Sequence, residues 1–207
     1  MRLYDYEGSA NAYKVRLLLA LLATTCERVP VEIFRGESRT PNFLAKNPAG
    51  RVPVLEFDDG TVLPESNAIL WRLAHGTPFA PSGIREEAEV LRWMFFEQSE
   101  IEPNVGSARF WLLTGRAASR EDELGRRLET GRRALAAMNA HLAGCRFFVG
   151  ERFTIADVAL YAYSHLAADA GIDVAPLAAL SAWFTRVEAR PRYLPGPGPY
   201  SEAAHLR

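Results

Sequence analysis

The sequence predicts a chain of two parts, a small mixed α/β domain followed by an all-helical domain. Three observations predict this architecture. Residues 1–76 alternate strand-like and helix-like patterns. Residues 77–84 are rich in glycine, proline and serine, which is typical of a linker. In residues 85–207 apolar side chains recur at helical spacing and strand signals nearly vanish, which predicts a helix bundle with an extended tail.

The first domain is expected to follow a βαβ order and then a ββα order. Strands are predicted at residues 3–6, 29–34, 52–57 and 61–63, and helices at residues 11–23, 41–46 and 65–75. A turn-forming run, Asn47-Pro48-Ala49-Gly50, separates the two halves, and Asp58-Asp59-Gly60 suits the turn of a hairpin. This order is compatible with a small mixed sheet that carries helices on its faces.

The second domain is expected to contain four helices. They are predicted at residues 86–113, 120–142, 154–168 and 177–189, and Pro103 is expected to bend the first. Thr154 followed three residues later by Asp157 predicts a helix start at which hydroxyl and carboxylate satisfy the first backbone amides, so Asp157 reads as structural. The proline-rich tail, residues 191–207, is expected to lie extended along the surface or to be partly mobile.

Composition and charge exclude several function classes. The chain is 48% hydrophobic and 24% charged, and its formal net charge of -1 gives no field that would favour nucleic acid or an anionic membrane. Apolar stretches such as residues 15–23 fall short of a membrane span, and the N-terminus does not resemble a secretory signal. Cys26 and Cys145 match no CxxC or metal pattern, so we expect no metal, free thiols and a reducing, cytoplasmic compartment.

The most informative segments are Gly50-Arg51-Val52-Pro53-Val54-Leu55 and Leu63-Pro64-Glu65-Ser66-Asn67-Ala68-Ile69. A proline that opens a strand cannot donate to the sheet ladder, and a cis bond there would turn the amide and carbonyl of Val52 outward. Ser66, at a predicted helix start, offers a hydroxyl and a terminal amide to a carboxylate, while Glu65 can face an ammonium group. Together these residues suit the head group of an amino acid.

These motifs resemble the cytosolic glutathione transferase family, in its bacterial serine-type or Nu-like branches. The resemblance covers nearly the whole chain: V-P-V-L followed by E-S-N-A-I-L, the N-terminal Y-x-x-x-S-x-N-x-x-K-V-R-L-x-L, and the F-T-I-A-D-V-A-L helix start. It implies a thioredoxin-like first domain that binds glutathione and an all-helical second domain that shapes a pocket for a small hydrophobic electrophile. It also implies a homodimer, and glutathione as co-substrate with no tightly bound cofactor.

The resemblance implies specific glutathione contacts. The backbone of Val52, before Pro53, would pair with the cysteinyl part, and Glu65 and Ser66 would hold the γ-glutamyl end. Arg39 falls where related sequences often place a cation for the glycyl carboxylate, although a solvated surface arginine is the alternative reading.

The reactive sulfur needs a donor, because the thiolate and not the thiol is the nucleophile. Ser9, in the loop before the first helix, resembles the donor of the serine-using branches and is the first choice. Asn11 either approaches the sulfur with Ser9, as in Nu-class branches where disulfide reduction is prominent, or caps the helix. Tyr4 and Tyr6 are rival hydroxyls, but both lie within the first strand. Cys26 follows the first helix, so we expect no cysteine of this chain to take part.

The electrophile pocket is expected to be largely apolar and to border the sulfur. Its candidates are Tyr13, Asn104, Arg109, Phe110 and Trp111. The leading functional hypothesis is conjugation of glutathione to small electrophiles, with detoxification as its role. The alternatives are glutathione-dependent reduction of disulfides or peroxides and a non-catalytic interaction module of the same fold.

Overall fold

The computed structural model describes residues 1–206 and divides the chain into two compact units. The first unit combines Met1–His75 with the tail from residue 191, and the second is Gly76–Arg190. The sequence assigned the tail to the helical part, but its contacts are with the first unit. Tail residues 193–201 have no regular secondary structure, and a short 3-10 helix, η5 (Glu202–His205), follows them.

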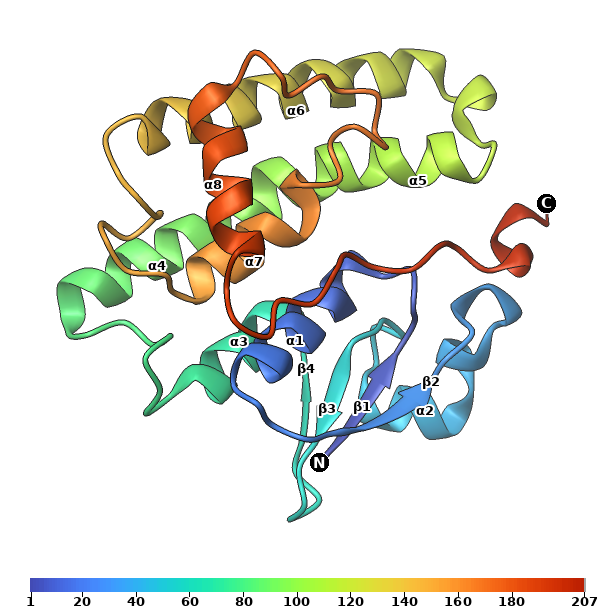
Figure 1. Ribbon diagram of the computed structural model, residues 1–207. Helices are drawn as coiled ribbons and strands as arrows, with labels where there is room; N and C mark the ends of the chain where they lie inside the picture. Colours follow the sequence, from blue (N-terminus) through green and yellow to red (C-terminus); the bar gives the residue numbers. More distant parts are fainter. Residues whose placement is uncertain (207) are drawn as a thin grey trace. The chain divides into compact units, whose positions relative to one another are not determined.

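The first unit is built on a four-stranded mixed sheet in the order β2-β1-β3-β4 (Figure 1). Its elements are, in chain order, β1 (Arg2–Asp5), α1 (Ala10–Leu21), β2 (Glu27–Pro30), the 3-10 helices η1 (Ile33–Arg35) and η2 (Glu37–Arg39), α2 (Pro41–Lys46), β3 (Val54–Glu56), β4 (Val62–Pro64) and α3 (Ser66–Ala74). β1 runs parallel to β2 and antiparallel to β3, and β3 pairs antiparallel with β4. This is the predicted βαβ-ββα order, so the thioredoxin-like part of the fold class is confirmed.

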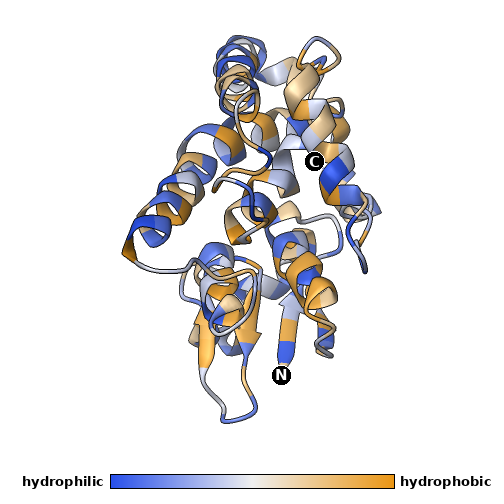
Figure 2. Cartoon of the chain, turned by 60° about the vertical axis from the view of Figure 1, so that its left-hand side comes forward, coloured by the Kyte–Doolittle hydropathy of each residue, from blue (hydrophilic) through white to orange (hydrophobic). Residues whose placement is uncertain are grey.

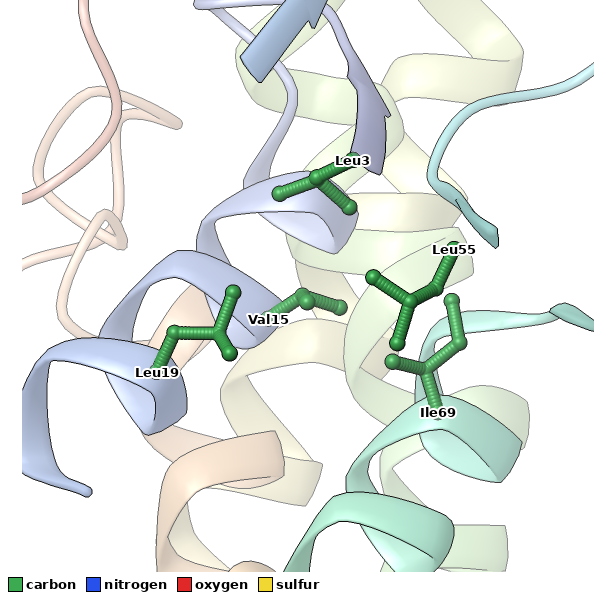
Figure 3. Close-up of a cluster of buried hydrophobic side chains, with 5 residues drawn as sticks. All are labelled: Leu3, Val15, Leu19, Leu55 and Ile69. Atoms are coloured by element: carbon green, nitrogen blue, oxygen red, sulfur yellow. The ribbon is translucent and has the colours of Figure 1, made fainter. Parts of the chain in front are cut away.

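The core of this unit lies on one face of the sheet. Leu3 and Leu55 from the strands meet Val15 and Leu19 of α1 and Ile69 of α3 (Figure 3), and all five side chains are at most 5% exposed. Burial of each such side chain stabilises the fold by roughly 1.5–3 kcal/mol. These contacts fix α1 and α3 side by side on the sheet.

The opposite face of the sheet is covered by α2. Because successive strand residues point to opposite faces, Val54 leaves the α1 side and packs with Val31 and Phe43 of the α2 side. β3 and β4 are mostly hydrophobic and the turn that joins them is hydrophilic (Figure 2). The predicted hairpin across Asp58-Asp59-Gly60 is thereby confirmed.

The second strand is shorter than the sequence predicts. Residues 29–34 were expected to be extended, but β2 ends at Pro30 and η1 follows. Proline cannot donate to a sheet ladder, and the carboxylate of Glu32 accepts a hydrogen bond from the amide of Phe34 at 3.1 Å, which caps the 3-10 turn. The alternating pattern of the sequence does not reveal this cap.

The second unit is entirely helical apart from two isolated bridges among its residues, so the predicted all-α part is also confirmed. Its helices are α4 (Ile84–Phe96), the π-helix η3 (Glu97–Gly106), α5 (Ser107–Leu113), the 3-10 helix η4 (Ala117–Ser119), α6 (Glu121–Leu142), α7 (Ile155–Ser164) and α8 (Ala178–Glu188). The expected bend at Pro103 takes the form of this π-helix. A proline cannot supply an interior helical amide and crowds the preceding turn, and wider π turns relieve that crowding.

The predicted start of α7 is confirmed as a capping box. Thr154 is the N-cap, and the carboxylate of Asp157 accepts a hydrogen bond from the Thr154 amide at 2.9 Å. The other carboxylate oxygen accepts from the amide of Phe148 and from the indole N–H of Trp183. Burial nevertheless raises the pKa of Asp157 to about 6, because the charged form is desolvated. Asp157 therefore ties α7 to α8 and to the loop before α7.

Neither a membrane-spanning helix nor a metal-binding cluster is found among the described residues. Over residues 1–206 no helix is both long and apolar enough to cross a membrane. The same residues contain no group of three or more His, Cys, Asp or Glu side chains arranged to hold a metal ion. Neither cysteine forms a disulfide.

Candidate active site

Strand register brings the predicted glutathione residues to one edge of the sheet. Val54 pairs with Pro64 of β4 and with Tyr4 of β1. Continuing the antiparallel register beyond Val54 places Val52 and Pro53 beside Glu65 and Ser66. The same register places them beside the end of β1, from which the loop 6–9 leads into α1. Three separated motifs of the sequence thus converge at this sheet edge.

Val52 lies just outside the paired part of the sheet. The ladder with β4 begins at Val54, and the Val52–Pro53 peptide bond is cis. The preceding loop is held by Asn47, which is 4% exposed and whose side chain accepts from the Ala49 amide at 3.0 Å and donates to the Arg51 carbonyl at 2.8 Å. The half-buried Val52 is therefore presented by a fixed loop.

Glu65 and Ser66 stand where α3 begins. Glu65 is exposed and has a φ of 71°, a left-handed conformation that costs a non-glycine residue roughly 1–3 kcal/mol and is concentrated at binding sites. Ser66 is 5% exposed and is the first residue of the nine-residue helix. A negative side chain and a positive helix end thus lie next to each other, which suits an ammonium group and a carboxylate on one carbon atom.

A hydrogen-bonded chain behind Ser66 joins α3 to α1. The Ser66 hydroxyl donates to Asn11 Oδ1 at 3.1 Å, and the ammonium group of Lys14 donates to Ser66 Oγ at 3.4 Å. Lys14 is fully buried, so its charge acts through a medium of lower dielectric than water. The positive charge beneath Ser66 favours an anion at the α3 start.

Ser9 is the N-cap of α1. Its backbone is extended, and its hydroxyl oxygen accepts a hydrogen bond from the Ala12 amide at 3.1 Å. A hydroxyl that accepts this bond keeps its own proton for donation. The alternative that Asn11 caps the helix is therefore wrong: Asn11 lies inside α1, and its side chain reaches Ser66 instead.

The tyrosine hydroxyls that rival Ser9 have partners within the first unit. Tyr4 donates to the carboxylate of Glu56 at 2.8 Å. The hydroxyl of Tyr6 accepts from the Ser201 amide at 2.7 Å and lies 3.2 Å from its hydroxyl oxygen. Cys26 contacts the carbonyl of Met1, at the end of the sheet opposite the Ser9 loop.

The loop from Tyr6 to Ser9 is anchored by Arg16, a role that the sequence analysis missed. Arg16 donates to both carboxylate oxygens of the buried Asp5 at 2.7 and 2.8 Å and to the carbonyl of Glu7 at 2.9 Å. Arg28 also contacts Asp5. The signal was present, because Lys14 and Arg16 interrupt an otherwise apolar helix and charged residues are seldom buried without partners.

Arg39 lies against the loop that leads to Val52. It is exposed, and its guanidinium donates to the carbonyl of Ala49 at 3.0 Å. A side chain on Gly50 would place its Cβ 2.9 Å from the backbone carbonyl oxygen of Ser38, and the φ of Gly50 is +62°, so both the close contact and the backbone conformation favour glycine there. The cation is brought to the same loop as Val52.

The predicted pocket residues differ in accessibility. Tyr13 is fully buried in the first unit, where its hydroxyl donates to the carbonyl of Leu194 at 2.6 Å. In the second unit Asn104 donates to the Glu100 carbonyl, and Arg109 forms an ion pair with Asp169. Tyr13, Asn104, Arg109 and Trp111 are each at most 9% exposed. Of these five described candidates only Phe110 exceeds that value.

Two family descriptions match separate segments of the chain. Residues 3–79 match the glutathione S-transferase N-terminal domain, and residues 93–191 match the glutathione S-transferase C-terminal domain. Among solved structures, a glutathione S-transferase from Pseudomonas fluorescens is 44% identical, with a TM-score of 0.92 over 94% of this chain and 97% of that chain. A possible glutathione S-transferase from Rhodopseudomonas palustris is 49% identical, with a TM-score of 0.91 over 94% and 96%.

A relative of a different kind also matches. Rice elongation factor 1-gamma 1 is 32% identical over 169 residues, which are 76% of this chain and 38% of that protein. The chain thus spans well under half the length of this relative. The two domain matches and the near-complete likeness to bacterial structures agree with the motifs gathered at the sheet edge. The chain belongs to the glutathione S-transferase family.

Proposed function

We propose that this protein is a glutathione transferase that binds reduced glutathione along the sheet edge and activates its thiol through Ser9. The backbone of Val52, before cis-Pro53, pairs with the cysteinyl part of the ligand. Glu65 faces the γ-glutamyl ammonium group, Ser66 receives the carboxylate, and Arg39 receives the glycyl carboxylate. The observation that carries the proposal is the register, which puts Val52, Ser66 and the Ser9 loop at one edge.

Activation of the thiol is an electrostatic task. A free thiol has a pKa near 8.5, and lowering it by roughly two units takes about 2.7 kcal/mol of preferential interaction with the anion. A hydrogen bond to a charged acceptor supplies about 1.5–3 kcal/mol. Ser9 keeps a proton to donate and stands at the positive end of the twelve-residue α1, which adds to the stabilisation. Donor and helix end together are sufficient.

The thiolate then attacks a small hydrophobic electrophile. One bond forms between sulfur and an electrophilic carbon, and the electrons leave with a halide or pass to an epoxide or enolate oxygen, which takes a proton. Phe110 is the pocket candidate with accessible surface in the second unit, where the buried Asn104, Arg109 and Trp111 would support it. The protein would need no tightly bound cofactor and would serve detoxification in the cytoplasm.

Calorimetric titration with reduced glutathione tests the binding part. The unchanged protein is expected to release or absorb heat, and the double variant Glu65→Ala, Ser66→Ala is expected to bind at least about a hundredfold more weakly, because two charge-assisted contacts are lost. Glu129→Ala, which removes an exposed carboxylate of α6, is the control and should bind normally. No binding by the unchanged protein at millimolar glutathione would exclude the proposal.

Two alternatives are kept because specific observations favour them. Asn11 lies in the first turn of α1 beside Ser9, a pattern that also suits glutathione-dependent reduction of disulfides or peroxides. Rapid turnover of hydroxyethyl disulfide with little conjugation of chlorodinitrobenzene would establish reduction as the main activity. The likeness to an elongation factor 1-gamma keeps a non-catalytic interaction module open, and glutathione binding without turnover of either substrate would favour it.

Homodimer formation is the remaining part of the proposal. On α4, Trp93 faces the interior at 4% exposure, whereas Ile84, Leu91 and Phe95 are 82%, 38% and 70% exposed. Their spacing of seven and four residues places them along one helix face. A second copy covering this stripe would remove it from water, so Phe95→Arg should shift the mass measured by light scattering from dimer to monomer. An unchanged mass would exclude this face as the interface.

A further inference from the structure

The C-terminal tail returns to the loop that carries Ser9. In Figure 1 the red tail passes α1 and ends on the side of the sheet that carries β2. The carbonyl of Leu194 accepts from Tyr13 of α1, and the amide of Ser201 donates to the hydroxyl of Tyr6. The ring of Tyr200 stacks on Tyr6 with 6.4 Å between centroids and meets Phe34 edge-on. Tail and loop are thus joined at several points.

The fit between tail and loop leaves no spare room. A Cβ on Gly8 would lie 3.1 Å from both the Pro199 carbonyl oxygen and the Tyr200 ring. A Cβ on Gly198 would lie 2.6 Å from Glu7 Cγ. Arg28 first, and the Gly198 amide to a lesser degree, hold the pKa of Glu7 below its usual value. A side chain on Gly8 would require the Pro199 carbonyl or the Tyr200 ring to shift, and one on Gly198 would displace the side chain of Glu7.

The loop is held from two sides as a result. Arg16, which is paired with Asp5, anchors it from within by donating to the carbonyls of Tyr6 and Glu7. Tail residues 198–201 press on its outer side, at the residues directly before Ser9. The loop that leads to Ser9 is therefore in contact with a distant segment of the chain, since Tyr6 and Ser201 are 195 residues apart in sequence.

We propose that the C-terminal tail is a positioning element for the catalytic loop, with Tyr200 as its principal contact. The inference rests on the proposed activation of glutathione by Ser9. A donor held in place stabilises a thiolate without reorganising when the charge appears, whereas a loose loop must be ordered first. Loss of the tail contact should therefore weaken thiol activation more than glutathione binding, because Val52, Glu65 and Ser66 stay in place.

The test is the pKa of the thiol in the binary complex with glutathione, followed by ultraviolet thiolate absorbance across pH. Tyr200→Ala is expected to raise this pKa by about one unit, a tenfold loss of thiolate at low pH. Tyr200→Phe keeps the ring and should restore most of the shift. Calorimetry should show a glutathione Kd changed by no more than about twofold, since the contacts lie at separate residues.

Two further variants separate positioning from general support of the fold. Phe57→Ala removes a partly buried ring at the far end of the same sheet, so it should lower the Tm without moving the thiol pKa. Ser201→Pro removes the backbone N–H that donates a hydrogen bond to the Tyr6 hydroxyl. The φ of Ser201 is -64°, which proline can adopt. This variant should raise the thiol pKa as Tyr200→Ala does.

The outcomes are distinguishable. If the unchanged protein shows no lowered thiol pKa, the proposed function itself is wrong and this inference with it. In the second outcome the unchanged protein lowers the thiol pKa of bound glutathione, and Tyr200→Ala and Ser201→Pro reduce the Tm without changing that pKa. Only the positioning role is then overturned.

Discussion

At the scale of single residues, Ser9 combines two roles that substitution can separate. It caps α1 through its hydroxyl oxygen, and in the proposed function it donates its proton to the glutathione sulfur. Replacing an N-cap serine with alanine lowers the free energy of unfolding by about 1 kcal/mol, whereas replacing it with glycine lowers it by only a few tenths of a kcal/mol. Any thiol activation depends on the hydroxyl alone, which neither replacement supplies.

Ser9→Ala and Ser9→Gly are therefore expected to raise the pKa of bound glutathione equally, toward 8.5, while differing in stability. The pH dependence of kcat/KM for the electrophile at saturating glutathione measures the pKa of the bound thiol. Urea denaturation measures the difference in stability. If both variants keep the low thiol pKa, another group, such as Asn11, is the donor.

Arg16 is the residue on which the loop most depends. Its ion pair with Asp5 joins side chains that are 6% and 1% exposed. Removal of one partner leaves a buried charge uncompensated, so Arg16→Met is expected to lower the free energy of unfolding by about 3–5 kcal/mol. Arg2→Met, whose ion pairs are exposed, should cost less than about 1 kcal/mol. Equal costs in chemical denaturation would contradict the anchoring role.

At the scale of elements, the capping box of α7 shows how one side chain can fix several segments. Asp157 accepts from two backbone amides and one indole N–H. Asp157→Ala leaves these buried donors without partners, and we expect a loss of about 3 kcal/mol or more in the free energy of unfolding. Asp122→Ala, which removes an exposed carboxylate in the first turn of α6, should lose less than about 1 kcal/mol. Similar thermal denaturation of the two variants would be inconsistent with this account.

Element order and the α7 cap could be predicted because local patterns determine them. Apolar periodicity identified both halves, and Thr154 and Asp157 carry their cap within four residues of sequence. The shortened β2 and the π-helix around Pro103 were not predicted in that form, because they depend on a Glu32 cap and on how a missing amide is accommodated.

The sequence predicts the residues of the candidate site but not the hydrogen-bond network that joins them. The motifs identified Val52, Glu65 and Ser66, and the strand register brings them together. The contact of Asn11 with Ser66, the buried Lys14 and the return of the tail to Tyr6 all join residues distant in sequence. No spacing rule in a single sequence reveals such pairs.

At the scale of the whole molecule, two buried groups oppose each other in the dependence of stability on pH. Burial lowers the pKa of His165 to about 4, so His165 stabilises the fold less as pH falls from 6.5 toward 4. Burial raises the pKa of Asp157 to about 6, so Asp157 stabilises the fold less as pH rises from 4 toward 6. Between pH 4 and 6 the two effects therefore act in opposite directions.

His165→Gln should remove the contribution of His165 to the pH dependence of stability and leave that of Asp157. The free energy of unfolding of the variant is then expected to fall by about 3 kcal/mol relative to the unchanged protein as pH rises from 4 to 6.5. Urea denaturation of both proteins at several pH values measures this difference. Parallel curves for the two proteins would show that His165 does not titrate as its burial requires.

The proposed function depends on where glutathione binds, and a crystal structure of the complex tests it most directly. We expect glutathione to lie extended beside Val52, with its γ-glutamyl end at Glu65 and Ser66 and its sulfur within hydrogen-bond distance of Ser9 Oγ. A structure at saturating glutathione that shows this sheet edge unoccupied, or the sulfur turned away from the Ser9 loop, would contradict it.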